Sequence, residues 1–271
     1  MRLSWLGALL VVPSLASCVQ FNAECSPPVD QPDFVITWLA APVPIDKTVV
    51  RTHESALGDA ITDAFLAALK GSGLHPQVAI DNAGDMRDLG LCVTRTELGK
   101  GALKRKVLKQ VIAFSDELVT VRISQLDLFN ILEHGVATVG VPGVNPGGQF
   151  LQVSGLSYEV DCSKPAEVLS SGGQRTSSGQ RVRSITLGGE TITRAEASDS
   201  ASVIVALSSF LAGGGDNFID LAGKASAKAI PERYTYNVVE DYLHGLGASE
   251  ASPAKVAVDP QNPRIVLENC E

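Results

Sequence analysis

The spacing of apolar residues predicts a helix early in the chain and a strand after it. Between Leu57 and Ala68 apolar positions recur every three or four residues, with Ser55 placed as an N-terminal cap and Gly71 as a stop. Residues 78–80 are a short apolar run typical of a buried strand. The polar loop 81–88 follows it directly, and functional side chains often lie on such loops.

The second half of the chain is richer in strand patterns. Apolar residues alternate with polar ones at 119–123, and Ser124 with Asp127 form a capping-box pattern that opens a helix continuing to Val139. Strand-like stretches follow at 151–153, 156–160, 182–187 and 203–207, and a glycine pair at 188–189 predicts a hairpin turn. Residues 170–180 have the composition of an exposed, flexible insertion. This order predicts an α+β fold in which a mixed sheet has flanking helices.

The N-terminal residues predict export. Arg2 precedes an apolar stretch, residues 3–15, that is too short to cross a bilayer and is typical of a signal peptide. The stretch ends in Leu-Ala-Ser-Cys, which resembles a lipoprotein cleavage site with Cys18 as the acylated residue. Ordinary signal cleavage, with Cys18 incidental, is the alternative. We expect a signal peptide over 1–17, a lipoprotein tether and Pro-rich lead-in over 18–49, a domain over 50–271, and a membrane-anchored location in the periplasm or on the cell surface.

The remaining cysteines indicate disulfides. Apart from Cys18 the chain has four, Cys25, Cys92, Cys162 and Cys270, an even number in an oxidising compartment. Two disulfides are expected, and the spacing leaves all three pairings open.

Composition and charge exclude several classes of function. With a net charge of -8 and no basic run longer than residues 104–106, nucleic-acid binding is not expected. The four histidines are widely spaced, so no metal site is expected. Nucleophile-elbow, phosphate-loop and dinucleotide-binding motifs are missing, so we name no catalytic residue and no cofactor for this chain.

Two phenylalanines next to glycine-rich turns are the candidate binding residues. Phe150 follows two glycines, and Phe210 precedes a run of three glycines and Asp216. Two such rings can enclose a flat heterocycle, and a carboxylate can accept hydrogen bonds from both ribose hydroxyls. Phenylalanine is also a common core residue, and the residues alone leave both readings open.

Six segments of the chain follow one another in a characteristic order. They are Glu54-Ser55-x-Leu57-Gly58-x-x-Ile61-Thr62-Asp63-Ala64, Asn82-x-Gly84-x-x-Arg87, Phe114, Leu132-Glu133-His134, Phe150-Leu151-Gln152-Val153-Ser154-Gly155 and Phe210-Leu211-Ala212-x-Gly214-Gly215-Asp216-x-Phe218. From about residue 50 to about 222 this set resembles the C-terminal, substrate-binding domain of the 5'-nucleotidase family.

The resemblance implies roles for several residues. It implies that Phe150 and Phe210 stack on the two faces of a base, that Asp216 holds the ribose, and that Asn82 and Arg87 contact base and phosphate. It also places Gly214 and Gly215 in the substrate-binding motif.

Departures from the family pattern shape the expected function. Relatives carry an N-terminal metallophosphatase domain that binds two metal ions, whereas here only the Pro-rich lead-in precedes the match. Asp85 and Asp116 add carboxylates that would repel a phosphate.

The resulting expectation is an exported nucleoside- or nucleotide-binding module, either non-catalytic or the substrate-binding part of a split nucleotidase. Divalent metals would then belong to a separate metallophosphatase chain. The alternatives are a hydrolase of nucleotide catabolism that acts with such a partner, and a degenerate structural or interaction domain.

The lipoprotein expectation predicts where the protein fractionates. The parent protein should remain with membranes in high salt and be released by detergent, because an acyl anchor is held by apolar contact with lipid. Replacing Cys18 with serine should move the protein to the soluble fraction of the same cells. Recovery of the parent protein mainly in the soluble fraction would contradict acylation of Cys18.

Overall fold

The computed structural model describes residues 32–88, 95–224, 226–228, 233–247 and 249–270. The expected signal peptide, Cys18, Cys25 and Cys92 lie outside these residues. Within them, no helix is both long and apolar enough to cross a membrane.

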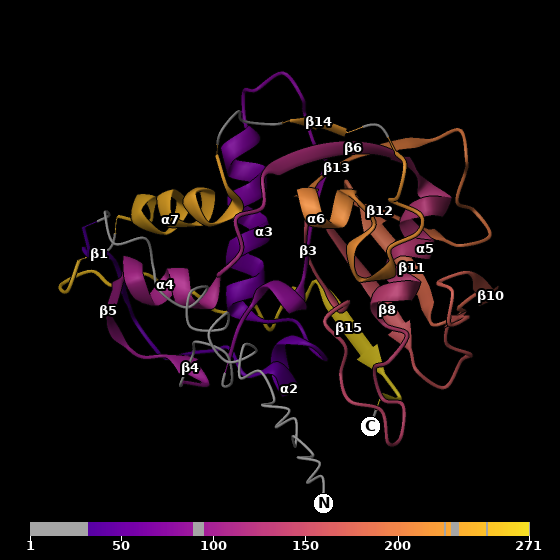
Figure 1. Ribbon diagram of the computed structural model, residues 1–271, viewed down its shortest axis with the longest axis horizontal. Helices are drawn as coiled ribbons and strands as arrows, with labels where there is room; N and C mark the ends of the chain where they lie inside the picture. Colours follow the sequence, from indigo (N-terminus) through magenta and orange to yellow (C-terminus); the bar gives the residue numbers. More distant parts are fainter. Residues whose placement is uncertain (1–31, 89–94, 225, 229–232, 248, 271) are drawn as a thin grey trace, which may run out of the picture.

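A five-stranded mixed sheet forms the centre of the domain (Figure 1). In spatial order its strands are β14 (Ser226–Lys228), β6 (Leu118–Ser124), β13 (Ser202–Ser208), β3 (Val78–Asn82) and β7 (Leu151–Ser154). Only β13 and β3 run parallel; the other neighbours are antiparallel. All five residues of β3 are buried, as its apolar run predicts.

A second sheet continues from β7. Its strands lie in the order β12 (Glu190–Thr193), β11 (Val182–Leu187), β8 (Leu156–Asp161) and β15 (Ile265–Glu268), with β15 parallel to β8. Gly155 links β7 to β8 with a φ of +79°, and a Cβ there would lie 2.0 Å from the carbonyl oxygen of Gln77. Only glycine therefore fits the point where the chain passes between the sheets.

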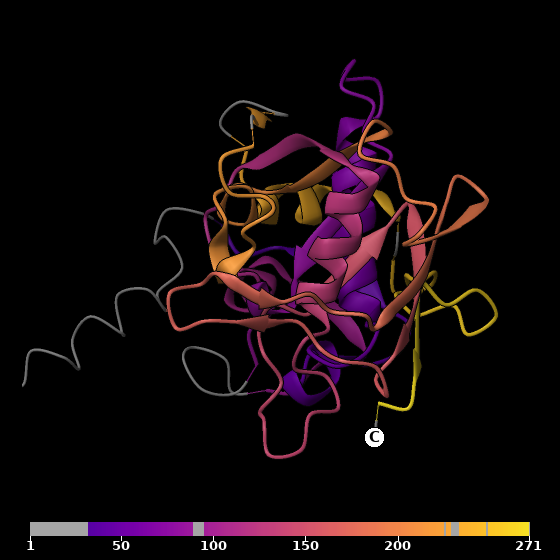
Figure 2. The ribbon, with the colours of Figure 1, turned by 90° about the vertical axis from the view of Figure 1, so that its right-hand side faces the viewer.

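Helices pack around these sheets, as Figures 1 and 2 show. Helix α3 (Ala56–Leu69) packs on β3 and β7 and is capped by Ser55, which accepts a hydrogen bond from the amide of Gly58. Helix α5 (Gln125–Gly135) has the expected capping box and contacts β6 and β11. It ends at Gly135, earlier than the pattern up to Val139 predicts. Helix α7 (Thr235–Gly245) packs on α3, and α4 (Arg105–Val111) packs on α7.

The folded domain begins before residue 50, which corrects the expected boundary. Strand β1 (Val35–Leu39) pairs with β5 (Gly101–Lys104), and β2 (Val43–Pro44) pairs with β4 (Glu97–Leu98). Helix α2 (Lys47–Val50) follows, capped by Asp46. Pro44 lies in β2 and Pro42 directly before it, in a short edge strand where a missing amide donor is tolerated.

The segment 170–180 is more structured than its composition indicates. It contains β10 (Arg175–Ser177), which pairs with β9 (Val168–Leu169). Arg175 forms ion pairs with Glu167 and Asp220. These long-range partners cannot be read from a local run of serine and glycine.

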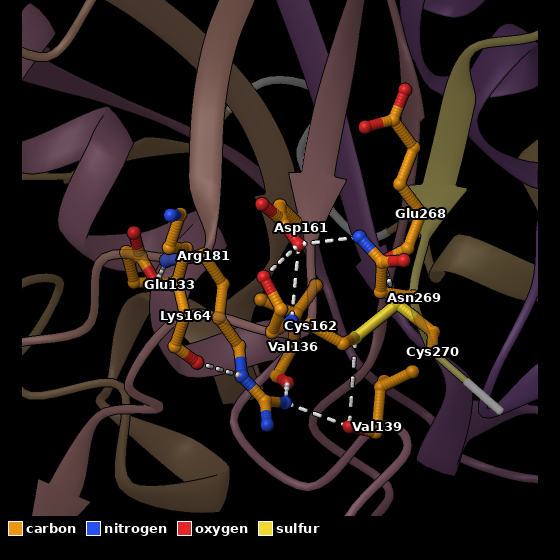
Figure 3. Close-up of a disulfide and its surroundings, with 11 residues drawn as sticks. Glu133, Val136, Val139, Asp161, Cys162, Lys164, Arg181, Glu268, Asn269 and Cys270 are labelled. Carbon is orange, nitrogen blue, oxygen red and sulfur yellow. Dashed lines mark hydrogen bonds between the residues drawn. A yellow bond between two sulfur atoms is a disulfide. The ribbon is translucent and has the colours of Figure 1, made fainter.

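A disulfide between Cys162 and Cys270 ties the C-terminal end of the described chain to the end of β8 (Figure 3). Asn269 adds a hydrogen bond of 2.9 Å to Asp161 beside it. The disulfide joins residues that are 108 positions apart, so it strongly reduces the conformational entropy of the unfolded chain.

Loss of this disulfide should destabilise the domain. The double replacement of Cys162 and Cys270 with serine should lower the free energy of unfolding by about 2–5 kcal/mol, measured by denaturant titration. Each single replacement should cost a similar amount, because either one breaks the same bond. A double variant as stable as the parent would contradict a structural role.

Asp81 on β3 is a buried carboxyl group whose neighbour is a second carboxyl group. Its side-chain hydrogen bond is with Asp85, which requires a proton on one of the two. Burial, together with the negative charges of Asp85 and Asp116, raises the pKa of Asp81 well above its ordinary value. The folded protein therefore keeps a proton on Asp81 that the unfolded chain releases, so stability falls as pH rises above the ordinary carboxyl pKa.

Replacing Asp81 with asparagine should therefore stabilise the protein in a pH-dependent way. At about pH 8 the free energy of unfolding of the variant should exceed that of the parent by about 1–3 kcal/mol, because the variant has no acid to ionise in the core. Its unfolding temperature should be higher as well. Near pH 4, where the unfolded Asp81 is itself partly protonated, this advantage should shrink. Glu190→Gln, on an exposed hairpin, is the matched control. An equal effect of Asp81→Asn at both pH values would contradict the account.

Candidate functional site

A cavity of about 290 Å³ opens where the loop after β3 meets α6 (Ser209–Ala212) and the turn that follows it. This volume is near the lower end for ligand pockets, roughly 300–1,000 Å³. The lining residues are Arg51, Asn82, Gly84, Asp85, Arg87, Phe114, Asp116, Gly148, Phe210 and Asp216. The cavity therefore combines aromatic rings, two cations and several carboxylates.

Two phenylalanine rings line the cavity. Phe114 and Phe210 keep 38% and 41% of their surface exposed, which is unusual for phenylalanine. The guanidinium of Arg87 lies 4.5 Å from the centre of the Phe114 ring. The Phe210 ring rests against Gly215, where a Cβ would come within 2.5 Å of ring atoms. Gly215 thus makes room for the ring, as a larger residue could not.

Phe150 is a core residue, which corrects the expected stacking pair. Its side chain is 1% exposed and does not line the cavity, so from this position it cannot stack on a ligand. The neighbouring glycine has another purpose: the carbonyl of Gly148 accepts a 2.9 Å hydrogen bond from the amide of Gly84, and a Cβ on Gly148 would lie 3.2 Å from the Gly84 Cα. Gly148 allows the two loops to approach each other closely, so a glycine before Phe150 does not indicate that the ring is exposed.

Ser209 ties together the two segments that carry the exposed rings. Its hydroxyl donates to a carboxylate oxygen of Asp116 at 3.2 Å and accepts from the amide of Glu117 at 3.1 Å. The amide of Ser209 donates to the carbonyl of Glu117 at 2.8 Å. These hydrogen bonds therefore hold together the backbone segments that carry Phe114 and Phe210.

Asp216 and Asn82 meet on another wall of the cavity. The amide nitrogen of Asn82 donates to Asp216 Oδ2 at 2.9 Å, while the buried Asn82 Oδ1 has no partner among the described residues. Asp216 has a left-handed backbone with a φ of +50°, and Gly214 before it has a φ of +85°. This turn aims the Asp216 carboxylate at Asn82 and leaves acceptor atoms available in the cavity.

Arginines give the cavity its positive charge. Arg51, at the end of α2, donates to the carbonyl of Pro146 at 3.5 Å, and Arg87 follows the loop after β3. The Nε atoms of both are buried without a hydrogen-bond partner in the described part of the chain. Partial burial, with the nearby charge of Arg51, lowers the pKa of Arg87.

Asp85 and Asp116, the two carboxylates expected to repel a phosphate, both line the cavity. Burial raises the pKa of Asp85 to about 7, with Asp116 adding to the effect and Arg87 opposing it. With Asp216, three carboxylates face two arginines, so the lining is not a simple cationic pocket for a phosphate.

The structure brings most of the expected binding residues together. It differs from the expectation in that Phe114 takes the place of Phe150 and that Arg51 also lines the cavity. Asn82, Arg87, Phe210 and Asp216 line one cavity, and Gly214 and Gly215 shape the loop that carries Asp216. Sequence reasoning gave Phe114 no role, although the residue belongs to the motif set, and it missed Arg51. The position of Arg51 three residues before the Glu54 motif is the only signal in the sequence that could have drawn attention to it.

Metal ligands are not grouped in the part of the chain that the structure describes. No group of three or more His, Cys, Asp or Glu side chains there is arranged to hold a metal ion. The described donor set does not fit a two-metal centre, so no catalytic step is derived through one.

Comparisons with solved structures show the same fold in nucleotidases. A 5'-nucleotidase precursor from Thermus thermophilus matches with a TM-score of 0.67 and 27% identity, over 87% of this chain and 39% of that one. A putative 5'-nucleotidase from Staphylococcus aureus matches with a TM-score of 0.62 and 14% identity, over 87% and 41% of the two chains. The NAD nucleotidase of Haemophilus influenzae gives 0.54 and 14%, over 87% and 38%.

The likeness covers part of these relatives only. This chain spans about two fifths of the length of the solved structures that it matches. No curated protein matched the sequence. A family profile described as "5'-nucleotidase, C-terminal domain" matches residues 36–223, which is more than half of the chain. The chain therefore belongs to the 5'-nucleotidase C-terminal domain family.

Proposed function

We propose that this chain binds a nucleoside, with the base between Phe114 and Phe210. The observation that carries the proposal is the pair of exposed rings at one cavity whose loops are held together by Ser209. Stacking on an aromatic ring contributes about 1–3 kcal/mol per base, and holding the two backbone segments together lowers the cost of ordering them on binding.

The polar wall supports recognition of the sugar and the base edge. The Asp216 carboxylate keeps acceptor capacity beyond its bond to Asn82 and can receive both hydroxyls of a ribose. Asn82 Oδ1 can accept a hydrogen bond from the ligand, which would remove the cost of leaving a buried acceptor unpaired.

The charges favour a nucleoside over a nucleotide. Arg51 and Arg87 could attract a phosphate, but Asp85 and Asp116 line the same cavity and would repel it. Two like charges 4 Å apart repel by about 1 kcal/mol in water and more where water is excluded. The repulsion grows as Asp85 ionises above about pH 7.

The wider role that we propose is that of a binding module. On this proposal the chain is exported, anchored through Cys18, and non-catalytic alone. It acts by itself or as the substrate-binding part of a split nucleotidase whose separate metallophosphatase chain holds the divalent metals. Membership of the 5'-nucleotidase C-terminal domain family supports the substrate-binding part of this proposal.

The two exposed rings and the buried one give a direct test. Phe114→Ala and Phe210→Ala should each weaken adenosine binding by about 1–3 kcal/mol in calorimetry, while the unliganded protein loses little stability because both rings are exposed. Phe150→Ala is the matched control: it should cost roughly 3–5 kcal/mol of folding stability, as a truncated core ring does.

Two results would contradict the proposed function. One is a parent protein that binds no nucleoside, which would favour a structural or interaction domain. The other is normal adenosine affinity in the Phe114→Ala and Phe210→Ala double variant, which would place the ligand elsewhere.

A further inference from the structure

His134 lies behind the binding loop and is held on both sides. The residue belongs to α5 and is buried. Its Nδ1 is 2.6 Å from Oε2 of Glu167, and its Nε2 is 2.8 Å from the backbone carbonyl oxygen of Asp216. Phe218 packs edge-on against the imidazole, with 4.8 Å between ring centres.

Both partners of this imidazole are acceptors. A backbone carbonyl oxygen can only accept, and Glu167 is held as a carboxylate by Arg175, whose Nε lies 2.6 Å from Oε1. Burial alone would raise the pKa of Glu167, but its bonds to His134 and Arg175 lower it instead. Each ring nitrogen of His134 must therefore carry a proton, so the ring is an imidazolium.

The charged groups around His134 alternate in sign. Asp220 pairs with Arg175, Arg175 with Glu167, and Glu167 with His134. Burial by itself would lower the pKa of His134, but the bonds to Glu167 and to the carbonyl of Asp216 raise it above its ordinary value. Glu133, on the same helix, is directed to β11 and its lead-in instead, where it accepts hydrogen bonds from two backbone amides.

We propose that His134, as an imidazolium, is the positioning residue for Asp216 and makes ribose recognition depend on pH. The inference rests on the proposed nucleoside site, because it concerns the carboxylate that would hold the sugar. Asp216 has a left-handed backbone with a φ of +50°, a region that aspartate adopts more readily than most residues but at a cost that glycine does not have. The bond from His134 to its carbonyl helps to hold this conformation.

Loss of one proton would break this arrangement. A neutral imidazole has a single N–H, and the charged Glu167 is the stronger acceptor, so Nδ1 would keep the proton. The lone pair of Nε2 would then face the carbonyl oxygen of Asp216 at the present 2.8 Å, which is repulsive. The Asp216 peptide would move, and with it the carboxylate that holds Asn82 and the ribose.

The test compares two ligands that differ only in the sugar hydroxyls. Affinities of the full chain for adenosine and for 2',3'-dideoxyadenosine are measured by calorimetry from about pH 6 to 9. The preference for adenosine should fall by about tenfold as pH rises through the raised pKa of His134, the size expected for one hydrogen bond to a charged group. The pKa of Asp85 is raised to about 7, and its charge acts on Asp216, so the part of the pH dependence that belongs to His134 is the part that His134→Gln removes.

Variants separate positioning from simple structural damage. In Glu167→Gln the imidazolium loses its counter-charge, so the preference for adenosine should be lost at a lower pH than in the parent. In His134→Gln the preference should be small and should lack the part of the pH dependence that belongs to His134. His244→Gln is the matched control, because that histidine also bonds a backbone carbonyl, that of Ile36 at 3.0 Å, but lies on α7. It should behave like the parent.

The possible failures can be told apart. The role of His134 is wrong, while the nucleoside site stands, if both ligands bind but the ratio of their affinities does not change with pH. The same holds if Glu167→Gln does not shift the pH at which the preference for adenosine is half lost. If neither ligand binds at any pH, the proposed function fails and the role of His134 fails with it.

Discussion

The candidate site depends on the parallel pairing of β3 with β13 in the centre of the sheet. Val78 and Ala79 pair with Val205 and Ala206, so both strands end at the same edge. One end carries Asn82, and the other leads through α6 (Ser209–Ala212) to the loop that holds Asp216. The hydrogen bond between these two side chains joins loops that are 134 residues apart in the sequence. Parallel strands commonly present binding loops together in this way.

The same edge carries groups that cost stability. Asp81 is buried beside the carboxyl group of Asp85. Among the described residues, Asn82 has an unpaired oxygen, and Arg51 and Arg87 each keep a buried unpaired Nε. Unsatisfied groups of this kind are rare in a core, and these three line one cavity. Deviations of this type are expected at binding sites, where the ligand supplies the missing partners.

The sequence was sufficient for elements that local signals specify. The cap at Ser55, the capping box at Ser124 and the buried strand at β3 are all confirmed, because each depends on residues close in the chain. Exposure of a ring depends on distant packing, which is why sequence reasoning assigns Phe150 wrongly to stacking. An even number of cysteines does not select the Cys162–Cys270 pairing, because this pairing depends on β15 lying beside β8.

In the proposed binding mode, one cavity places a base between Phe114 and Phe210 and a ribose on Asp216. The most direct measurement is a structure of the protein with bound adenosine, by crystallography or by nuclear Overhauser contacts between ligand and ring protons. Both rings should contact the base, and the ribose hydroxyls should lie within hydrogen-bond distance of the Asp216 carboxylate. Adenosine bound away from either ring, or with its ribose directed at another residue, would rule out this binding mode.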